Sequence, residues 1–209
     1  MVKKNIIVCV SGSGRSLENL IKCEDEYSYH VSGVVSSSKT CKAIEIAKAY
    51  NLPLLTIGFP LDTASKEFEV CAGSLKDFFK EYKADLIVLA GFLRPFPLSS
   101  CEEKLKVINI HPSLLPKFGG KGMYGKKVHK AVIESNETHS GASVHFVTEV
   151  YDEGKVIAQV KVERKKDDTA ESLAQRVFEG EKKLLPKAAN MVLKKELTIE
   201  SENILTITL

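Results

Sequence analysis

The sequence predicts an α/β protein with a Rossmann-like, mostly parallel sheet flanked by helices. Two observations predict it. Apolar runs alternate with helical patterns through the first hundred residues, and these runs are continuous, as in strands buried on both faces. Later, two stretches of alternating polarity flank a turn, which predicts an antiparallel hairpin in the C-terminal half. The 209 residues are 44% hydrophobic, so we expect a single domain over 1–209, with halves at 1–100 and 101–209.

Composition narrows the classes of partner. The formal net charge is only +3 and the basic residues are scattered, so we expect no nucleic acid partner. The apolar run at the N-terminus is too short for a signal peptide or a membrane span, so we expect no membrane partner. An odd number of widely spaced cysteines argues against a disulfide framework and a zinc site, and it fits a reducing cytoplasm. These cysteines are Cys9, Cys23, Cys41, Cys71 and Cys101.

The first element is a strand at Asn5–Val10, followed by the loop SGSGRS and a helix that begins near Leu17. A strand, a glycine loop and a helix together direct free backbone N–H groups toward an anion. A dinucleotide fingerprint would require glycine at position 17, so we expect a single phosphate in place of NAD. Arg15 would add a positive charge to such a site.

The alternative for this loop is an ordinary strand-to-helix turn, in which Ser13 or Ser16 caps the helix. The loop alone does not separate the two interpretations.

Periodicity and turn residues predict the remaining elements. We expect strands at 30–35, 53–57, 84–90, 141–148 and 155–162, with short strand-like pieces at 197–199 and 204–207. The stretch 106–116 begins as a further strand and ends in a loop with two prolines. We expect helices at 41–50, 66–82, 126–135 and 169–193. Thr169 is the expected cap of the last helix, and His129 is expected on the surface of the helix before it. The glycine-rich segment 117–127 is too irregular for a regular element and could be a mobile active-site loop.

Two strand ends carry candidate functional groups. Asn109 and His111 lie two residues apart in KVINIHPSLLP, so their side chains share one face if the strand continues through them. An amide donor beside an imidazole suits a reaction in which a carbonyl oxygen becomes negative and a proton moves. Alternatively, both side chains merely satisfy the loop backbone. The second strand end is that of the expected strand at 84–90, where GFLRPF at 91–96 either forms one wall of a flat apolar pocket or covers the core.

Asp152 lies in the turn YDEG between the two alternating strands. Aspartate is common in turns for backbone reasons, but a carboxylate near an imidazole also orients the ring and favours its charged form. Only the fold decides whether this turn meets His111.

Four segments together carry a resemblance that covers residues 5–190. NIHPSLLP at 109–116 and SVHFVTEVYDEG at 143–154 resemble the two signatures of folate-dependent formyltransferases. SGSGRSLENL at 11–20 is similar to the phosphate loop of the branch that formylates phosphoribosylglycinamide, and LAGFLR at 89–94 to its folate-binding strand end.

The resemblance implies transfer of the formyl group of 10-formyltetrahydrofolate, as co-substrate and without a metal, to the amine of 5-phosphoribosylglycinamide in purine biosynthesis. It implies that Asn109 donates a hydrogen bond to the negative oxygen and that His111 also stabilises this oxygen. It assigns Asp152 to hold the imidazole and to relay a proton.

The resemblance also implies that the first half binds phosphate and that the second half binds folate and carries catalysis. It implies the following binding residues. Substrate phosphate and ribose would contact Gly12, Ser13, Gly14, Arg15, Ser16, Pro112, Ser113 and Glu181. Folate would contact Lys66, Phe92, Leu93, Arg94, Pro95, Phe96, Asn109, Thr148, Glu149 and Val150. The implied protein is a cytoplasmic monomer or homodimer that acts on small molecules.

Several alternatives stay open. A formyltetrahydrofolate deformylase typically lacks proline after the catalytic histidine, where this chain has Pro112, and it carries an extra N-terminal domain. A methionyl-tRNA formyltransferase carries an extra C-terminal domain. An amino-sugar-nucleotide formyltransferase would need room for a base and a diphosphate. A phosphate-binding module without catalysis would need none of the three catalytic residues. The chain departs from the family pattern at Arg15-Ser16-Leu17, Pro95 and Asp152-Glu153-Gly154.

Overall fold

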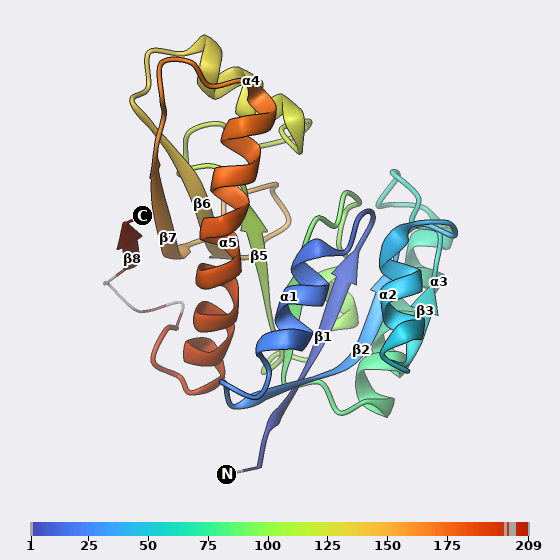
Figure 1. The fold of residues 1–209 in the computed structure, drawn as a ribbon. Coiled ribbons are helices and arrows are strands. Elements are labelled where there is room, and N and C mark those ends of the chain that lie inside the picture. Colours follow the sequence, from blue (N-terminus) through green and yellow to red (C-terminus); the bar gives the residue numbers. More distant parts are fainter. Residues whose placement is uncertain (1, 199, 201–203, 209) are drawn as a thin grey trace. The chain divides into compact units, whose positions relative to one another are not determined.

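The structure is a computed structural model that describes residues 2–198, 200 and 204–208. The chain divides into two compact units, Met1–Ile108 and Asn109–Leu209 (Figure 1). This boundary falls eight residues later than the expected one at 100, inside a strand. That both units act as one domain stays a prediction.

The first unit contains a parallel sheet with the strand order β3-β2-β1-β4. Strand β1 pairs in parallel with both β2 and β4, and β2 pairs in parallel with β3. The strands are β1 (Lys4–Val10), β2 (Tyr29–Ser36), β3 (Leu54–Thr56) and β4 (Leu86–Leu89). The helices are α1 (Arg15–Cys23), α2 (Lys42–Ala49), α3 (Lys66–Glu81) and the short 3-10 helix η1 (Leu98–Ser100).

The central strands of this unit form its core. The side chains from Ile6 to Val10 are completely buried, as a continuous apolar run in a parallel sheet predicts. All four residues of β4 are buried as well. Helix α3 begins at the Ser65 cap, whose hydroxyl accepts a hydrogen bond from the Phe68 N–H, and it continues unbroken through Gly73.

The second unit carries the antiparallel hairpin. Strand β6 (His139–Phe146) pairs antiparallel with β7 (Val156–Glu163), and β8 (Leu205–Thr208) pairs in parallel with β7. Helix α5 (Ala170–Leu193) packs against β6, β7 and α4 (Lys126–Glu134). Figure 1 shows α5 lying along β6 and β7. Strand β5 (Lys106–His111) spans the boundary between the two units.

The fold class is therefore as predicted: parallel strands with helices, followed by an antiparallel hairpin. Thr169 caps α5 as expected, with its hydroxyl accepting from the Ser172 N–H. The short strand at 204–207 is confirmed as β8. No helix of the described residues is both long enough and apolar enough to cross a membrane.

Three details differ from the predictions. His129 is only 5% exposed, so its expected surface position is wrong; α4 packs against α5 and the ring is covered. The 3-10 helix η1 was not predicted, because three residues carry no periodicity. In the expected strand at 197–199, Leu197 and Thr198 are not in a strand, and Ile199 lies outside the described residues.

Candidate active site

The glycine loop of the first unit leads into an uncapped helix. Gly14 is the N-cap residue of α1, with φ 71°, and no side chain caps the helix, so the interpretation with Ser13 or Ser16 as the cap is wrong. A Cβ atom at Gly14 would lie 2.8 Å from the Cα atom of Ala43, so this position also requires glycine for space. The first turn of α1 therefore offers backbone N–H groups without a competing side-chain acceptor, which suits an anion.

One hydroxyl joins this loop to the segment 91–96. The Ser11 Oγ atom accepts a hydrogen bond from the Leu93 N–H at 2.8 Å and lies 2.6 Å from the Ser37 Oγ atom. The Ser11 N–H in turn donates to the Gly91 carbonyl at 3.1 Å. The two segments predicted to bind phosphate and folate are thus side by side in the first unit.

Segment 91–96 combines a buried and an exposed apolar face. Phe92 is buried and packs edge-on against Phe59 at 5.0 Å between ring centroids, and against Phe96 at 6.1 Å. The next side chain, Leu93, is 48% exposed. The alternative that this segment covers the core is confirmed for Phe92, whereas the flat apolar pocket stays a prediction; Leu93 presents apolar surface for it. Arg94, Pro95 and Phe96 are half-buried. Lys66, the first residue of α3, is exposed.

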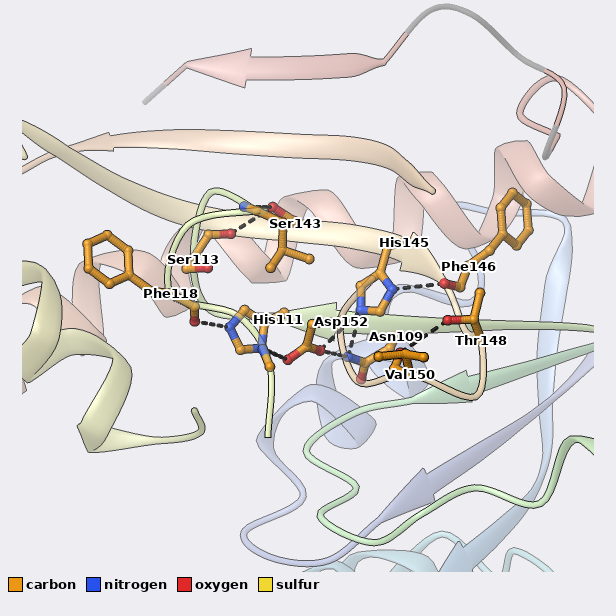
Figure 2. Close-up of polar contacts among 12 residues, drawn as sticks. Asn109, His111, Ser113, Phe118, Ser143, His145, Phe146, Thr148, Val150 and Asp152 are labelled. Atoms are coloured by element: carbon orange, nitrogen blue, oxygen red, sulfur yellow. Dashed lines mark hydrogen bonds and ion pairs between the residues drawn. The ribbon is translucent and has the colours of Figure 1, made fainter. Parts of the chain in front are cut away.

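In the second unit, the residues from the two signatures come together. Asn109 and His111 lie at the end of β5, and Asp152 lies in the connection between β6 and β7. The His111 Nδ1 atom is 3.4 Å from Asp152 Oδ2, and Asn109 Nδ2 is 3.4 Å from Asp152 Oδ1. Figure 2 shows the three side chains directed toward one another. The turn therefore meets the imidazole.

Both ring nitrogens of His111 face oxygen acceptors. Its Nε2 atom lies 2.8 Å from the Phe118 carbonyl oxygen, and its Nδ1 atom faces the Asp152 carboxylate. A ring between two acceptors is best satisfied when both nitrogens carry protons. Burial opposes this charge and lowers the pKa of His111, although the Asp152 carboxylate and the Phe118 carbonyl act to raise it. Both ring nitrogens therefore have acceptors for a proton, while burial makes the charged form less stable than it is in water.

Asp152 is held from both sides. Its Oδ2 atom accepts from the Gly120 N–H at 2.9 Å and faces His111, and its Oδ1 atom faces Asn109 and His145. Burial acts to raise the pKa of Asp152, but the nearby His145 ring, the charge of His111 and the Gly120 N–H together lower it. Its φ of 58° lies in the left-handed region, which aspartate and asparagine tolerate better than most residues.

Sequence reasoning missed three groups of this cluster. His145 contributes an imidazole whose Nε2 atom lies 3.0 Å from Asn109 Nδ2, and Phe118 and Gly120 contribute backbone groups. A signal for His145 was available, since it lies in the second signature seven residues before Asp152. The loop 117–127 carried no such signal, because backbone groups leave no mark on residue type.

Strand β6 also holds the loop that follows His111. The Ser143 hydroxyl is completely buried; it donates to the Ser113 carbonyl at 2.7 Å and accepts from the Leu115 N–H at 3.0 Å. Gln159 on β7 donates to the same hydroxyl and to the Leu115 carbonyl. The Ser113 hydroxyl donates to the Lys117 carbonyl at 2.6 Å, so it braces this loop.

The other predicted binding residues of this unit lie on different elements. Pro112 follows β5, and Glu181 lies half-buried on α5. Thr148, Glu149 and Val150 are exposed in the connection before Asp152, where the Thr148 hydroxyl donates to the Val150 carbonyl. Their contacts with substrate stay predictions. Among the described residues, no group of three or more histidine, cysteine, aspartate or glutamate side chains could hold a metal ion.

Comparison with known proteins identifies the family. The sequence pattern of the family described as formyl transferase matches residues 4–189. The chain belongs to the formyl transferase family. Among curated relatives, it is 39% identical to the chloroplastic phosphoribosylglycinamide formyltransferase of Arabidopsis thaliana, over 87% of this chain and 63% of that protein. It is 32% identical to the human trifunctional purine biosynthetic protein adenosine-3, over 91% of this chain and 18% of that protein. The chain thus spans about three fifths of the plant formyl transferase and a small part of the human protein.

Solved structures of the family share the fold. The glycinamide ribonucleotide transformylase 1 of Symbiobacterium toebii has a TM-score of 0.82 and 29% identity, covering 97% of this chain and 94% of that one. The phosphoribosylglycinamide formyltransferase of Anaplasma phagocytophilum has a TM-score of 0.80 and 26% identity, covering 99% and 98%. These matches agree with the formyl transferase fold predicted from the four segments.

Proposed function

We propose that this formyl transferase moves the formyl group of 10-formyltetrahydrofolate to the amine of 5-phosphoribosylglycinamide, a step of purine biosynthesis. The observation that carries the proposal is the convergence of an amide, an imidazole and a carboxylate at Asn109, His111 and Asp152. Relatives named for this reaction, at 39% and 37% identity over most of the chain, support the choice of substrates.

Asn109 and His111 act on the formyl oxygen. Attack by the substrate amine makes this oxygen negative, and the cluster offers it the Asn109 amide and the His111 ring. The Asn109 N–H that faces Asp152 does so at 3.4 Å, which is long for a hydrogen bond, so it can turn to the formyl oxygen at small cost. One good oxyanion donor contributes roughly 3–4 kcal/mol to the transition state.

Asp152 moves the proton. The attacking amine must lose a proton and the leaving folate nitrogen must gain one. A carboxylate that accepts from Gly120 and faces His111 is fixed in position for this relay. Acid–base assistance of this kind contributes about two to four powers of ten in rate.

The binding residues belong to the same proposal. The uncapped N-terminus of α1 and its loop, Gly12 to Ser16, would hold the phosphate, with Pro112, Ser113 and Glu181 at the phosphate and ribose. The exposed Leu93 beside a backbone fixed by Ser11 suits a flat ring, so residues 92–96, Lys66 and 148–150 would hold the folate. The units would act as one domain. We further propose a cytoplasmic monomer or homodimer; the cysteines of the described chain are all free, although the plant relatives are named chloroplastic.

The test is a spectroscopic assay for the folate product, with and without phosphoribosylglycinamide. Turnover that requires the ribonucleotide supports the proposal. Folate product released without the acceptor indicates a deformylase instead, and turnover only with an amino-sugar nucleotide indicates that substrate class. Phosphate-ligand binding without any turnover leaves a binding module and refutes the enzyme.

A further inference from the structure

His145 is a buried imidazole in the active-site cluster that the proposed mechanism leaves without a role. It lies near the end of β6 and is 2% exposed. The β6–β7 register shifts between Val144 and His145, and such irregularities next to active sites re-aim a side chain. Figure 2 shows the ring between Asn109 and the Phe146 carbonyl. Its two nitrogens therefore meet different partners.

The first partner fixes the tautomer of the ring. The Nδ1 atom of His145 lies 2.9 Å from the Phe146 carbonyl oxygen, which can only accept. This carbonyl is held in place, because the Phe146 N–H donates to the Lys155 carbonyl at 2.9 Å. A Cβ atom at Gly154 would lie 1.7 Å from the same carbonyl oxygen, so only glycine permits this turn. The proton of a neutral ring therefore sits on Nδ1, and Nε2 carries a lone pair.

The second partner, the Asn109 amide, donates a hydrogen bond to that lone pair. The Asn109 Nδ2 atom lies 3.0 Å from His145 Nε2, so the amide donates one N–H to the ring. If the amide were turned over, its oxygen would take the place of Nδ2 and lie about 3.4 Å from Asp152 Oδ1, where two oxygen atoms repel each other. The ring would then need a second proton to serve the amide oxygen. His145 Nε2 also lies 3.4 Å from Asp152 Oδ1, which is long for a hydrogen bond, so the 3.0 Å contact with the Asn109 amide decides the state of the ring. The arrangement that satisfies the shorter contacts keeps His145 neutral and the Asn109 amide nitrogen directed into the cluster.

We propose that His145 is a positioning residue that acts through Asn109. Its neutral ring, protonated on Nδ1, anchors one N–H of the amide and thereby leaves the second N–H for the formyl oxygen. The inference rests on the proposed function and adds a requirement to it. Without the acceptor at Nε2, only the long 3.4 Å contact with Asp152 Oδ1 orients the amide, so its oxygen faces the negative charge for part of the time.

Two neutral substitutions separate this role from simple packing. In His145→Gln the side-chain oxygen reaches the position of Nε2 and can still accept from Asn109. In His145→Asn the shorter amide reaches only the position of Nδ1, so it keeps the Phe146 contact and loses the acceptor. We expect kcat of His145→Asn to fall about 10- to 100-fold, less than the roughly 100- to 1000-fold loss of a whole oxyanion donor. His145→Gln should stay within about fivefold of the wild type, and KM for both substrates should change little in either variant.

An Asn109→Ala background supplies the second control. His145→Asn should lower kcat no further in this background, since there is no amide left to position. Equal losses in His145→Asn and His145→Gln, or multiplicative losses in the double variant, would overturn the inference and leave His145 a structural residue. Thermal melting of each variant identifies losses caused by unfolding.

A spectroscopic measurement tests the inference apart from turnover. The ¹⁵N shifts of the His145 ring in the wild-type protein at neutral pH should report a proton on Nδ1 and a lone pair on Nε2. A charged ring, or a proton on Nε2, would refute the inference even in an active enzyme. If the wild-type protein transfers no formyl group while the ring shows the expected tautomer, the proposed function fails and only the Asn109 contact stands.

Discussion

Replacing Asp152 with asparagine removes one charge from the cluster and leaves its shape. The φ of 58° at this position is one that asparagine adopts readily, so the turn should fold as before. The new amide oxygen can accept from the Gly120 N–H, and its NH₂ group then takes the place of Oδ1, 3.4 Å from both His145 Nε2 and the Asn109 amide nitrogen. The Asn109 N–H therefore loses a weak acceptor in this variant. The variant thus tests the charge and the proton relay, with little change in packing.

The expected loss follows from the role of the carboxylate. A positioned acid–base group contributes about 10²- to 10⁴-fold in rate, which corresponds to roughly 3–6 kcal/mol of transition-state stabilisation at about 1.4 kcal/mol per factor of ten. Asp152 also raises the pKa of His111, so the variant loses part of the charged imidazole as well. We therefore expect the loss in kcat to lie toward the upper end of this range.

The assay is formyl transfer at saturating concentrations of both substrates, with thermal melting as a check on folding. Glu153→Gln is the matched control, because it removes an exposed carboxylate from the same turn and should keep full activity. A folded Asp152→Asn protein with kcat within about threefold of the wild type would refute the assignment of the proton relay to this carboxylate.

Three further predictions concern stability and pH. Gly14→Ala should lower the free energy of unfolding by at least about 1–2 kcal/mol in thermal or urea unfolding, because φ is 71° at this position. Gly12 is exposed and a Cβ atom there would have no atom within 4 Å, so the control Gly12→Ala should melt like the wild type. Asp168→Asn should cost about 2–3 kcal/mol at pH 7, because this carboxylate accepts from Arg176 at 2.6 and 2.8 Å, and an unchanged urea midpoint would contradict this. The Arg176 guanidinium lowers the pKa of Asp168 from its ordinary 3.8, so this stabilisation is present above pH 4 and should fade in acid-unfolding curves as the pH falls further. In Asp152→Asn the lost charge lowers the pKa of His111, so a limb of the pH–rate profile that requires the charged His111 ring should move to lower pH. A limb that stays in place would exclude His111 as its source.

The sequence predicts what side-chain periodicity and caps control. Asn109 and His111 share a face because strand side chains repeat every two residues, and Thr169 caps α5 because its hydroxyl can reach the Ser172 N–H. Local chemistry alone left Asp152 ambiguous, since an aspartate with φ of 58° is also an ordinary turn residue. Only the three-dimensional path of the β6–β7 connection decides that it meets the imidazole.

The remaining parts of the site depend on backbone and on packing. The Phe118 carbonyl and the Gly120 N–H could come from any residue type, so no pattern in the loop 117–127 predicts them. The direction of the His145 side chain depends on a register shift in the β6–β7 pairing, which a strict alternation of side chains along the strand does not predict. His129 is buried because α4 is covered by a second helix, which a pattern local to α4 cannot reveal.

The hydroxyl of Ser11 has a thermodynamic consequence. It joins the backbone of Leu93 to the loop that begins at its own position, so the loop and segment 91–96 cannot shift independently. An anion that orders the loop reduces the conformational entropy lost when a flat ring binds against Leu93, so it raises the affinity for the ring. By reciprocity, the bound ring raises the affinity for the anion by the same factor. The first unit would therefore couple the affinities for both ligands through the two hydrogen bonds that Ser11 makes with Gly91 and Leu93.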